Sequence, residues 1–180
     1  MKIIFLDIDG VLNSQVAFKS GLCKHVEIDN APITYQKFYP EYKERLNKLI
    51  KKHNAKIVIS STWRTYWKLD GMKRIWENEG MEGEIIGVTG SSSNGFRGCE
   101  IDDYIKRKYG WILSVHPEVV KIQCDKIGLK NYVIIDDDGD MTYYQRFNFC
   151  HTRNETGFTE EAFNKADEIL DRNLWDICLF

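Results

Sequence analysis

Short, continuous apolar runs recur along this chain of 180 residues, and longer amphipathic segments separate them. Each run is too short for an ordinary helix and ends in polar or glycine-containing sequence, which is typical of a strand buried on both faces of a sheet. The predicted strands are Ile3–Asp7, Ala55–Ser60, Glu84–Val88, Asn131–Asp136 and Arg146–Cys150. Strands of this kind belong to parallel sheets that helices cover on both faces.

Helical periodicity fills the intervals between these strands. Pro40 opens a helix that runs to about His53, with apolar residues on one face and Lys or Glu on the other. Thr159 caps a final helix that carries two glutamates in its first turn. Further helices are predicted at Gly71–Glu79, at Cys99–Tyr109 and from Pro117 within the ambiguous segment Trp111–Leu129. The alternation of strands and helices predicts an α/β fold, a Rossmann-like three-layer sandwich with a parallel sheet.

The residues at the carboxyl ends of three predicted strands are polar in a way that suggests chemistry. The first strand ends in Asp7 and Asp9, followed by Gly10, the second ends in the hydroxyls of Ser60 and Ser61, and the fourth ends in Asp136 and Asp137. Bare carboxylates beside an apolar strand repel one another, so they make sense where a cation is shared or where their pKa values differ for catalysis. In open parallel sheets, ligands bind beyond these carboxyl ends.

The segment 13–40 separates the first strand from the first helix and has poor periodicity, with Gly21, Pro32 and Pro40 inside it. Connections of this length in a compact domain are usually functional or mobile. We expect an elaborated flap or minimal cap, built on a short helix or a strand pair. No repeat, low-complexity tract or second domain is evident, so residues 1–180 are predicted to form a single domain.

Composition and charge exclude several classes of protein. Hydrophobic residues make up 43% and charged residues 29% of the chain, and no apolar run is long enough to span a membrane. Met1 leads directly into a strand, so no signal peptide is predicted. The formal net charge of −2 gives the chain no general attraction for nucleic acid, although a few local basic residues could still bind a phosphate.

Cysteine and histidine chemistry is not indicated. The five cysteines are scattered and form no CxxC motif, which favours reduced thiols and a cytoplasmic location. No cysteine is followed six positions later by an arginine, as a cysteine-dependent phosphatase would require. The four histidines lack zinc-site spacing and are expected in surface or loop positions.

The polar strand ends, taken in order, resemble the haloacid dehalogenase-like phosphatase superfamily. More narrowly, the chain is similar to the haloacid dehalogenase-type (HAD) domain of Swiss Army Knife RNA repair proteins, from Met1 to about Leu170. The matching motifs are DIDGVLN at 7–13, VISSTWR at 58–64, RGCEIDDYI at 97–105, VIIDDDGDM at 133–141 and TGFTEEAF at 156–163.

This resemblance implies that the first and fourth strands are neighbours and that their carboxylates converge. Asp7 would be the nucleophile that forms an aspartyl-phosphate, and Asp9 would protonate the leaving oxygen and then activate water. Asp7, the Asp9 carbonyl, Asp136 and Asp137 would hold Mg²⁺, which prefers oxygen ligands. Asp138 or Asp140 is a candidate for a solvated turn residue.

The resemblance also calls for a hydroxyl and a cation that hold the phosphoryl group. Ser61 is the first candidate for the hydroxyl, and Ser60 and Thr62 are adjacent alternatives. Arg97 is the favoured cation, and Lys106 is the alternative.

Aromatic and basic residues follow the second strand. Trp63, Tyr66 and Trp67 could stack a nucleic-acid base, with Arg64 on a neighbouring phosphate, or the tryptophans could simply cover the core. Other cations that could line a path for phosphates are Lys68, Lys73 and Arg74.

The sequence therefore predicts a Mg²⁺-dependent phosphomonoesterase, with phosphorylated RNA or DNA ends as candidate substrates. One alternative is a phosphatase of nucleotides or sugar phosphates. The other is a binding module that keeps the fold, which the intact set of four acids disfavours. The sequence does not determine the oligomeric state, and no membrane association is expected.

Overall fold

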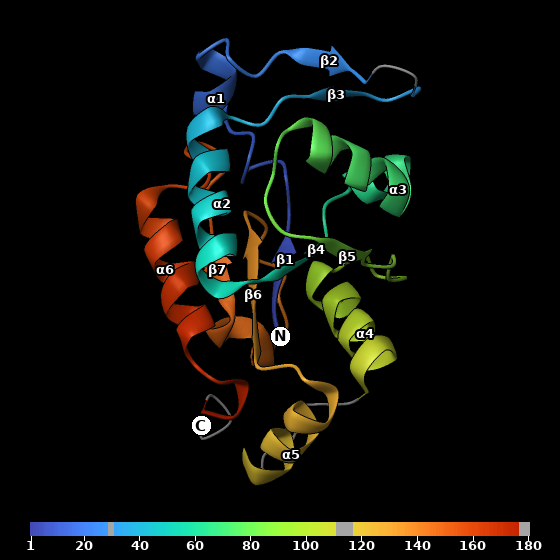
Figure 1. Ribbon diagram of the computed structural model, residues 1–180, viewed down its shortest axis with the longest axis vertical. Helices are drawn as coiled ribbons and strands as arrows, with labels where there is room; N and C mark the ends of the chain where they lie inside the picture. Colours follow the sequence, from blue (N-terminus) through green and yellow to red (C-terminus); the bar gives the residue numbers. More distant parts are fainter. Residues whose placement is uncertain (29–30, 111–116, 177–180) are drawn as a thin grey trace.

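The computed structural model describes residues 1–28, 31–110 and 117–176. Five parallel strands form its main sheet, in the order β5-β4-β1-β6-β7 (Figure 1). They are β1 (Lys2–Leu6), β4 (Lys56–Ile59), β5 (Ile85–Val88), β6 (Asn131–Asp136) and β7 (Phe149–His151). The central β1 pairs with both β4 and β6, so that Phe5 lies opposite Val58 and Ile134. The predicted fold class and the adjacency of the first and fourth predicted strands are confirmed.

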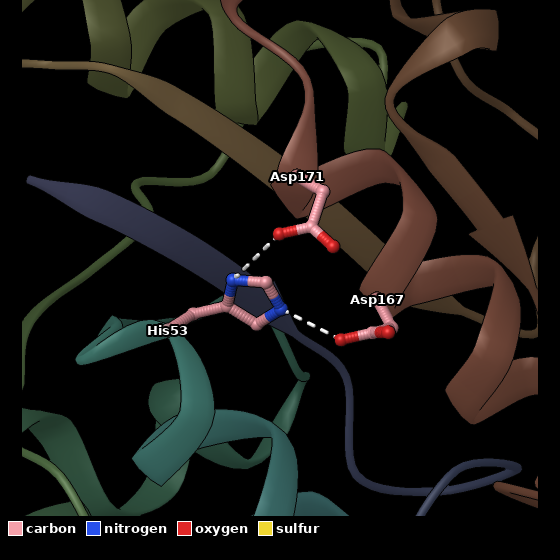
Figure 2. Close-up of side chains that lie close together, drawn as sticks. All are labelled: His53, Asp167 and Asp171. Carbon is pink, nitrogen blue, oxygen red and sulfur yellow. Dashed lines mark hydrogen bonds and ion pairs between the residues drawn. The ribbon is translucent and has the colours of Figure 1, made fainter.

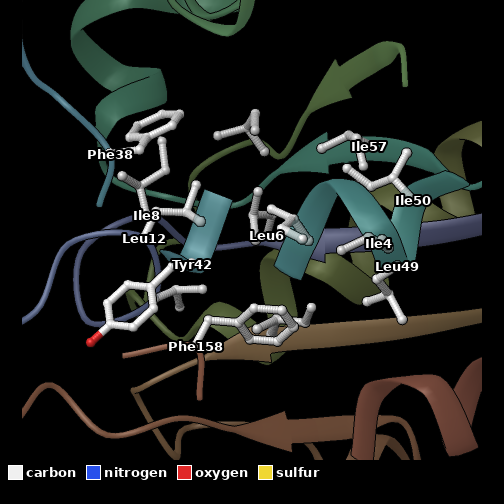
Figure 3. Close-up of a cluster of buried hydrophobic side chains, with 14 of the residues drawn as sticks. Ile4, Leu6, Ile8, Leu12, Phe38, Tyr42, Leu49, Ile50, Ile57 and Phe158 are labelled. Atoms are coloured by element: carbon white, nitrogen blue, oxygen red, sulfur yellow. The ribbon is translucent and has the colours of Figure 1, made fainter. Parts of the chain in front are cut away.

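Alternate side chains of the strands build two separate cores, because successive strand residues point to opposite faces. Ile4 and Leu6 face a core with Leu49 and Ile50, whereas Phe5 faces a second core with Ile101 (Figure 3 shows the first). The first face is covered by α2 (Pro40–His53), α3 (Trp63–Asn78) and α6 (Glu160–Asp171), and the second by α4 (Arg97–Tyr109) and α5 (Pro117–Ile127). The result is a sheet between two helical layers.

Residues 13–40, called the flap below, lie beyond the carboxyl end of β1 (Figure 1). Both the short helix and the strand pair expected there are present. They are α1 (Gln15–Lys19), β2 (His25–Glu27) and β3 (Thr34–Gln36), and the two strands pair in antiparallel orientation. Ile33, Tyr35 and Phe38 are buried in the first core, so the flap is packed against the domain.

Two element boundaries differ from the prediction. The helix expected from Gly71 begins at Trp63 and continues across a break at Lys68, whose φ is 54° and ψ is −171°. The predicted strand from Arg146 begins only at Phe149, because Tyr143–Phe147 forms a 3-10 helix, η1. The N–H of Thr142 donates to Oε1 of Gln145 (2.9 Å), which stabilises the start of η1. A second short 3-10 helix, η2 (Leu174–Asp176), follows α6.

Other predicted boundaries agree with the structure. Pro40 opens α2, Pro117 opens α5, and the Thr159 hydroxyl accepts the N–H of Ala162 at the start of α6 (3.3 Å). The remainder of the ambiguous segment, residues 111–116, lies outside the described residues. None of the helices in the described part of the chain is long and apolar enough to cross a membrane. The cytoplasmic location stays a prediction.

Candidate active site

Asp7 lies at the carboxyl end of β1, where its N–H donates to the carbonyl oxygen of Ile135 in β6 (3.0 Å). Its side chain is only 8% exposed. The chain then turns through Gly10, whose φ of +74° suits glycine. A Cβ atom on Gly10 would overlap the carboxyl group of Asp137. Glycine at this position therefore permits both the turn and the close approach of a second carboxylate.

Asp136 ends β6 and Asp137 follows it, beside Asp7. The three side chains each place a carboxylate oxygen within 4.8 Å of the other two. Oδ1 of Asp136 accepts the N–H of Asp138 (3.0 Å), but its buried Oδ2 has no hydrogen-bond partner. Buried carboxylate oxygens that lack donors and face other carboxylates fit a hard cation such as Mg²⁺.

Within the part of the chain that the structure describes, Arg97 is the arginine whose guanidinium contacts these carboxylates. Its Nη2 is 3.5 Å from Oδ1 of Asp7, and its Nε is 3.2 Å from Oδ2 of Asp136 without hydrogen-bond alignment. Arg97 is the first residue of α4, and its own N–H donates to Oδ2 of Asp140 (2.8 Å). Asp140 is thus a carboxylate at a helix N-terminus, where it stabilises α4 and holds the backbone of Arg97 in position.

Burial makes this carboxylate cluster hard to ionise. Burial, and then the charge of Asp136, raises the pKa of Asp7 well above its usual range, although Arg97 opposes the shift. Burial also raises the pKa of Asp136 to about 7, again against the effect of Arg97. Burial, and then the charge of Asp138, raises the pKa of Asp137. A bound cation would reverse these shifts by favouring the ionised forms.

Asp9 differs from the other acids because it is exposed. Its Oδ2 accepts a hydrogen bond from the indole Nε1–H of Trp63, at 2.8 Å. The two residues come from different elements, since Asp9 follows β1 and Trp63 begins α3. An exposed carboxylate held by one donor keeps its second oxygen available for other contacts.

The hydroxyl candidates follow β4. Ser60 and Ser61 are both fully buried, whereas Thr62 is exposed. Oγ of Ser60 has no hydrogen-bond partner, and Oγ of Ser61 accepts the N–H of Trp63 at 3.4 Å. Burial alone does not separate the two serines, so both stay candidates for the phosphoryl contact.

The Arg64 side chain is turned into the protein and does not face a substrate, as a phosphate contact would require. Its side chain is 5% exposed, and its five N–H groups are all engaged. The acceptors are the carbonyl oxygens of Ser60, Ser61, Thr89 and Gly90 and Oε2 of Glu100. The expectation that Arg64 contacts a substrate phosphate is therefore wrong for this arrangement. Arg64 instead ties the ends of β4 and β5 to α4.

Lys106 lies farther along α4 than Arg97. It is exposed in the last turn of α4, nine residues after Arg97. Nine residues of helix span about 13 Å at 1.5 Å per residue. The structure places the Arg97 guanidinium 3.5 Å from Asp7, which favours Arg97 as the cation, and Lys106 stays the alternative.

A second charged cluster lies at the opposite end of the sheet (Figure 2). His53 Nε2 is 2.8 Å from Oδ1 of Asp167, and Nδ1 is 3.8 Å from Oδ1 of Asp171. The Lys2 ammonium lies 3.0 Å from Nδ1, and the Lys52 ammonium lies 2.7 Å from Asp167. Contrary to the expectation of a surface histidine, the His53 side chain is only 2% exposed. The two lysines supply the positive charge here, so we assign this cluster to stability.

A parallel sheet with buried acids ending two adjacent central strands, and a guanidinium between them, defines a haloacid dehalogenase-like domain of the phosphatase superfamily. Residues 3–163 match the family model described as the HAD domain in Swiss Army Knife RNA repair proteins, and the chain belongs to this family. No curated protein and no solved structure matches the chain.

Three residues to which the sequence analysis gave no positioning role help to arrange the site. Trp63 bonds to Asp9, Asp140 caps the helix that begins with Arg97, and Glu100 lies between Arg64 and Arg97 at 2.5 Å and 3.8 Å. The local signal for Asp140 was its place in a glycine-containing acidic loop. Trp63 bonds to Asp9 and Glu100 bonds to Arg64 across distant segments, which periodicity does not reveal.

Proposed function

We propose that this chain is a Mg²⁺-dependent phosphomonoesterase that works through an aspartyl-phosphate on Asp7 and acts on phosphorylated ends of nucleic acid. One observation supports it above all: Asp7 and Asp136 are buried together, and Arg97 contacts both carboxylates. A purely structural core gains little from such a cluster, because buried acids repel one another and lose hydration. The cluster suits a site that receives a metal ion and a phosphate.

The chain supplies a nucleophile and charge stabilisation in this proposal. A carboxylate oxygen of Asp7 attacks phosphorus, and the guanidinium of Arg97, next to that carboxylate, offsets the charge on the phosphoryl oxygens. Ser61 or Ser60 donates a hydroxyl hydrogen to the same group. When bound by Asp7, Asp136 and Asp137, Mg²⁺ supplies further positive charge for the transferring phosphoryl group.

Asp9 moves the protons. In the first step its carboxyl group protonates the leaving oxygen as the ester P–O bond breaks. In the second step its carboxylate takes a proton from the water that hydrolyses the aspartyl-phosphate. General acid–base catalysis of this kind contributes about 10²–10⁴-fold. The exposed position of Asp9, one residue beyond the buried Ile8, suits a group that faces the substrate.

An open approach to the site favours a polymer end over an enclosed small molecule. The flap is a helix of five residues and two strands of three residues each, which is much smaller than a folded cap domain. Lys68 is exposed near the start of α3 and could contact a neighbouring phosphate. Lys73 lies farther along the same helix, and its charge, after the contribution of Lys56, lowers the pKa of Glu84 at the start of β5.

Phosphate release from a substrate panel tests this function. The panel compares a terminally phosphorylated oligonucleotide, the matching mononucleotide and a sugar phosphate, with Mg²⁺, with a chelator and with Zn²⁺. We expect turnover only with Mg²⁺, and a higher kcat/KM for the oligonucleotide at low salt that declines as salt rises. Activity that survives chelation would contradict the metal assignment.

Two lysine variants on α3 form a matched pair that tests whether this helix contacts the neighbouring phosphates of an oligonucleotide. Lys68→Ala is expected to lower the oligonucleotide advantage by several-fold, which corresponds to about 1 kcal/mol for one phosphate contact. Lys73→Ala, which removes the same charge farther from the site, is expected to leave it unchanged. A tenfold preference for the mononucleotide or sugar phosphate at every salt concentration would favour a small-molecule phosphatase. The absence of turnover on the whole panel would favour a binding module.

A further inference from the structure

The indole ring of Trp63 connects Asp9 to the flap. Its Nε1–H donates to Oδ2 of Asp9 at 2.8 Å. The same indole ring packs against two aromatic side chains of the flap. Its centroid lies 6.2 Å from that of Tyr35 and 6.0 Å from that of Phe38. Edge and tilted ring contacts at these distances have a preferred geometry. The orientation of the indole therefore depends on two flap residues.

Of the two flap residues, Tyr35 is itself held by buried polar bonds. The Tyr35 hydroxyl donates to Oε1 of Glu79 and accepts from Nδ2 of Asn78, both at 2.8 Å. The Lys43 ammonium, from α2, lies 3.1 Å from the other carboxylate oxygen of Glu79, whose side chain is 1% exposed. A buried network whose members all have partners is rigid, because any displacement leaves a polar group unpaired.

We propose that Trp63 is the positioning residue for Asp9, and that the flap acts on catalysis through Trp63; this inference rests on the proposed function, in which Asp9 is the acid and base. The indole N–H can only donate, so Oδ2 of Asp9 must accept. The proton exchanged with the substrate and with water is assigned to Oδ1, the oxygen that the indole does not contact. As the Asp7–phosphorus bond forms and the ester P–O bond breaks, Oδ1 gives this proton to the leaving oxygen, and later Oδ1 accepts a proton from water.

The dependence of the first step on the leaving group separates positioning from a general structural defect. Trp63→Phe keeps an aromatic ring but removes the donor. We expect the single-turnover rate of leaving-group release to fall by about tenfold to a hundredfold for an alkyl phosphate, as for other displaced catalytic groups. With 2,4-dinitrophenyl phosphate, whose leaving group needs no proton, the fall is expected to stay below about threefold.

Trp76→Phe is the matched control. Trp76 also donates its indole N–H, to the carbonyl oxygen of Glu82 at 3.0 Å, and also packs against Phe38, with ring centroids 6.4 Å apart. Its indole bonds to Glu82 and not to Asp9, so we expect no dependence of the Trp76→Phe effect on the leaving group.

A double variant tests the same coupling. In the Asp9→Ala background, Trp63→Phe is expected to lower the rate by less than about a further twofold, since the group that Trp63 positions is gone. An equal loss for both substrates, or a full further loss in that background, would overturn the proposal.

An NMR measurement tests the contact between Trp63 and Asp9 independently of enzymatic activity, and it requires no Trp63 variant. In Asp9→Ala, the indole ¹⁵N–¹H signal of Trp63 is expected to shift and to exchange faster with water, while that of Trp76 stays in place. An unchanged Trp63 signal would refute the positioning contact. If the wild-type protein releases no phosphate, the proposed function fails, and the NMR result still decides whether Trp63 holds Asp9.

Discussion

The two ends of the central sheet each hold a cluster of charged side chains, and the clusters differ in charge balance and burial. At the amino end, Asp167 and Asp171 face two lysines and His53. At the carboxyl end, three carboxylates lie together, and among the described residues Arg97 supplies the guanidinium that contacts two of them, Asp7 and Asp136. The side chain of Asp171 is 58% exposed, whereas the side chain of Asp136 is 1% exposed.

This difference supports the assignment of the amino-end cluster to stability and of the carboxyl-end cluster to the proposed function. At the amino end every charge has an opposite partner and water is close, so ion pairs form at a small desolvation penalty. At the carboxyl end the acids are buried and outnumber the cations, so the isolated protein holds an arrangement that opposes its own stability. Such an excess of charge becomes favourable when a cation or a phosphoryl transition state is present.

The largest contrast between the clusters is expected from replacing one acid in each. Asp7→Asn removes the nucleophile, and we expect phosphate release to fall by at least about a thousandfold, as for other nucleophile replacements. The melting temperature is expected to stay the same or to rise, because a buried repulsion is relieved. Asp167→Asn, at the amino end, is expected to leave kcat within about twofold. Turnover near the wild-type rate in Asp7→Asn would contradict the aspartyl-phosphate mechanism.

The carboxyl-end cluster was largely predictable from the sequence. Its acids follow apolar strands directly, so the strand pattern places Asp7 and Asp136 at the same edge of a parallel sheet. That the two strands are neighbours came from the family resemblance. The start of α4 is a smaller success, since the predicted helix began two residues after Arg97. Because Asp140 caps this helix from a distant loop, local sequence gave no exact beginning.

The amino-end cluster and the role of Arg64 could not be read from sequence. His53 and its partner Asp167 are 114 residues apart, and no spacing rule connects them. Arg64 follows the catalytic strand as a phosphate contact would, but four backbone carbonyls from two loops take up its donors. These assignments depend on tertiary geometry, which decides whether a charged side chain faces water, substrate or the backbone.

The two clusters are expected to respond to pH in opposite directions. The pKa of Asp136 is about 7 in the folded protein and 3.8 in its unperturbed state. The folded state therefore holds the extra proton between these values, and stability falls as pH rises from about 4 to about 7 in the absence of metal. The fall is on the order of a few kcal/mol. Burial raises the pKa of Asp167, but hydrogen bonds from Lys52 and His53 outweigh it and lower the pKa, so its contribution is lost only in acid.

Urea unfolding between pH 4 and pH 8, with divalent cations removed, measures this difference. Asp136→Asn is expected to reduce the fall, the remainder coming from Asp7 and Asp137, whose pKa values are also raised. Saturating Mg²⁺ is expected to restore wild-type stability at pH 8 by binding the ionised carboxylates. Asp167→Asn is expected to keep the fall between pH 4 and pH 7. A wild-type stability that is flat or rises over this range would show that the carboxyl-end acids ionise without penalty.

The smallest effect is expected from removing the amino-end histidine. His53→Ala deletes a side chain that is 2% exposed and leaves Asp167 without one of its hydrogen bonds. We expect a loss of about 1–3 kcal/mol in the free energy of unfolding, typical of a buried polar group that loses its partner. Lys52→Ala, whose side chain is 48% exposed, is expected to cost less than about 1 kcal/mol. Neither variant is expected to alter kcat or KM, because the cluster lies at the end of the sheet opposite Asp7. If His53→Ala instead lowered kcat while the melting temperature stayed unchanged, the separation of the two clusters into stability and function would be wrong.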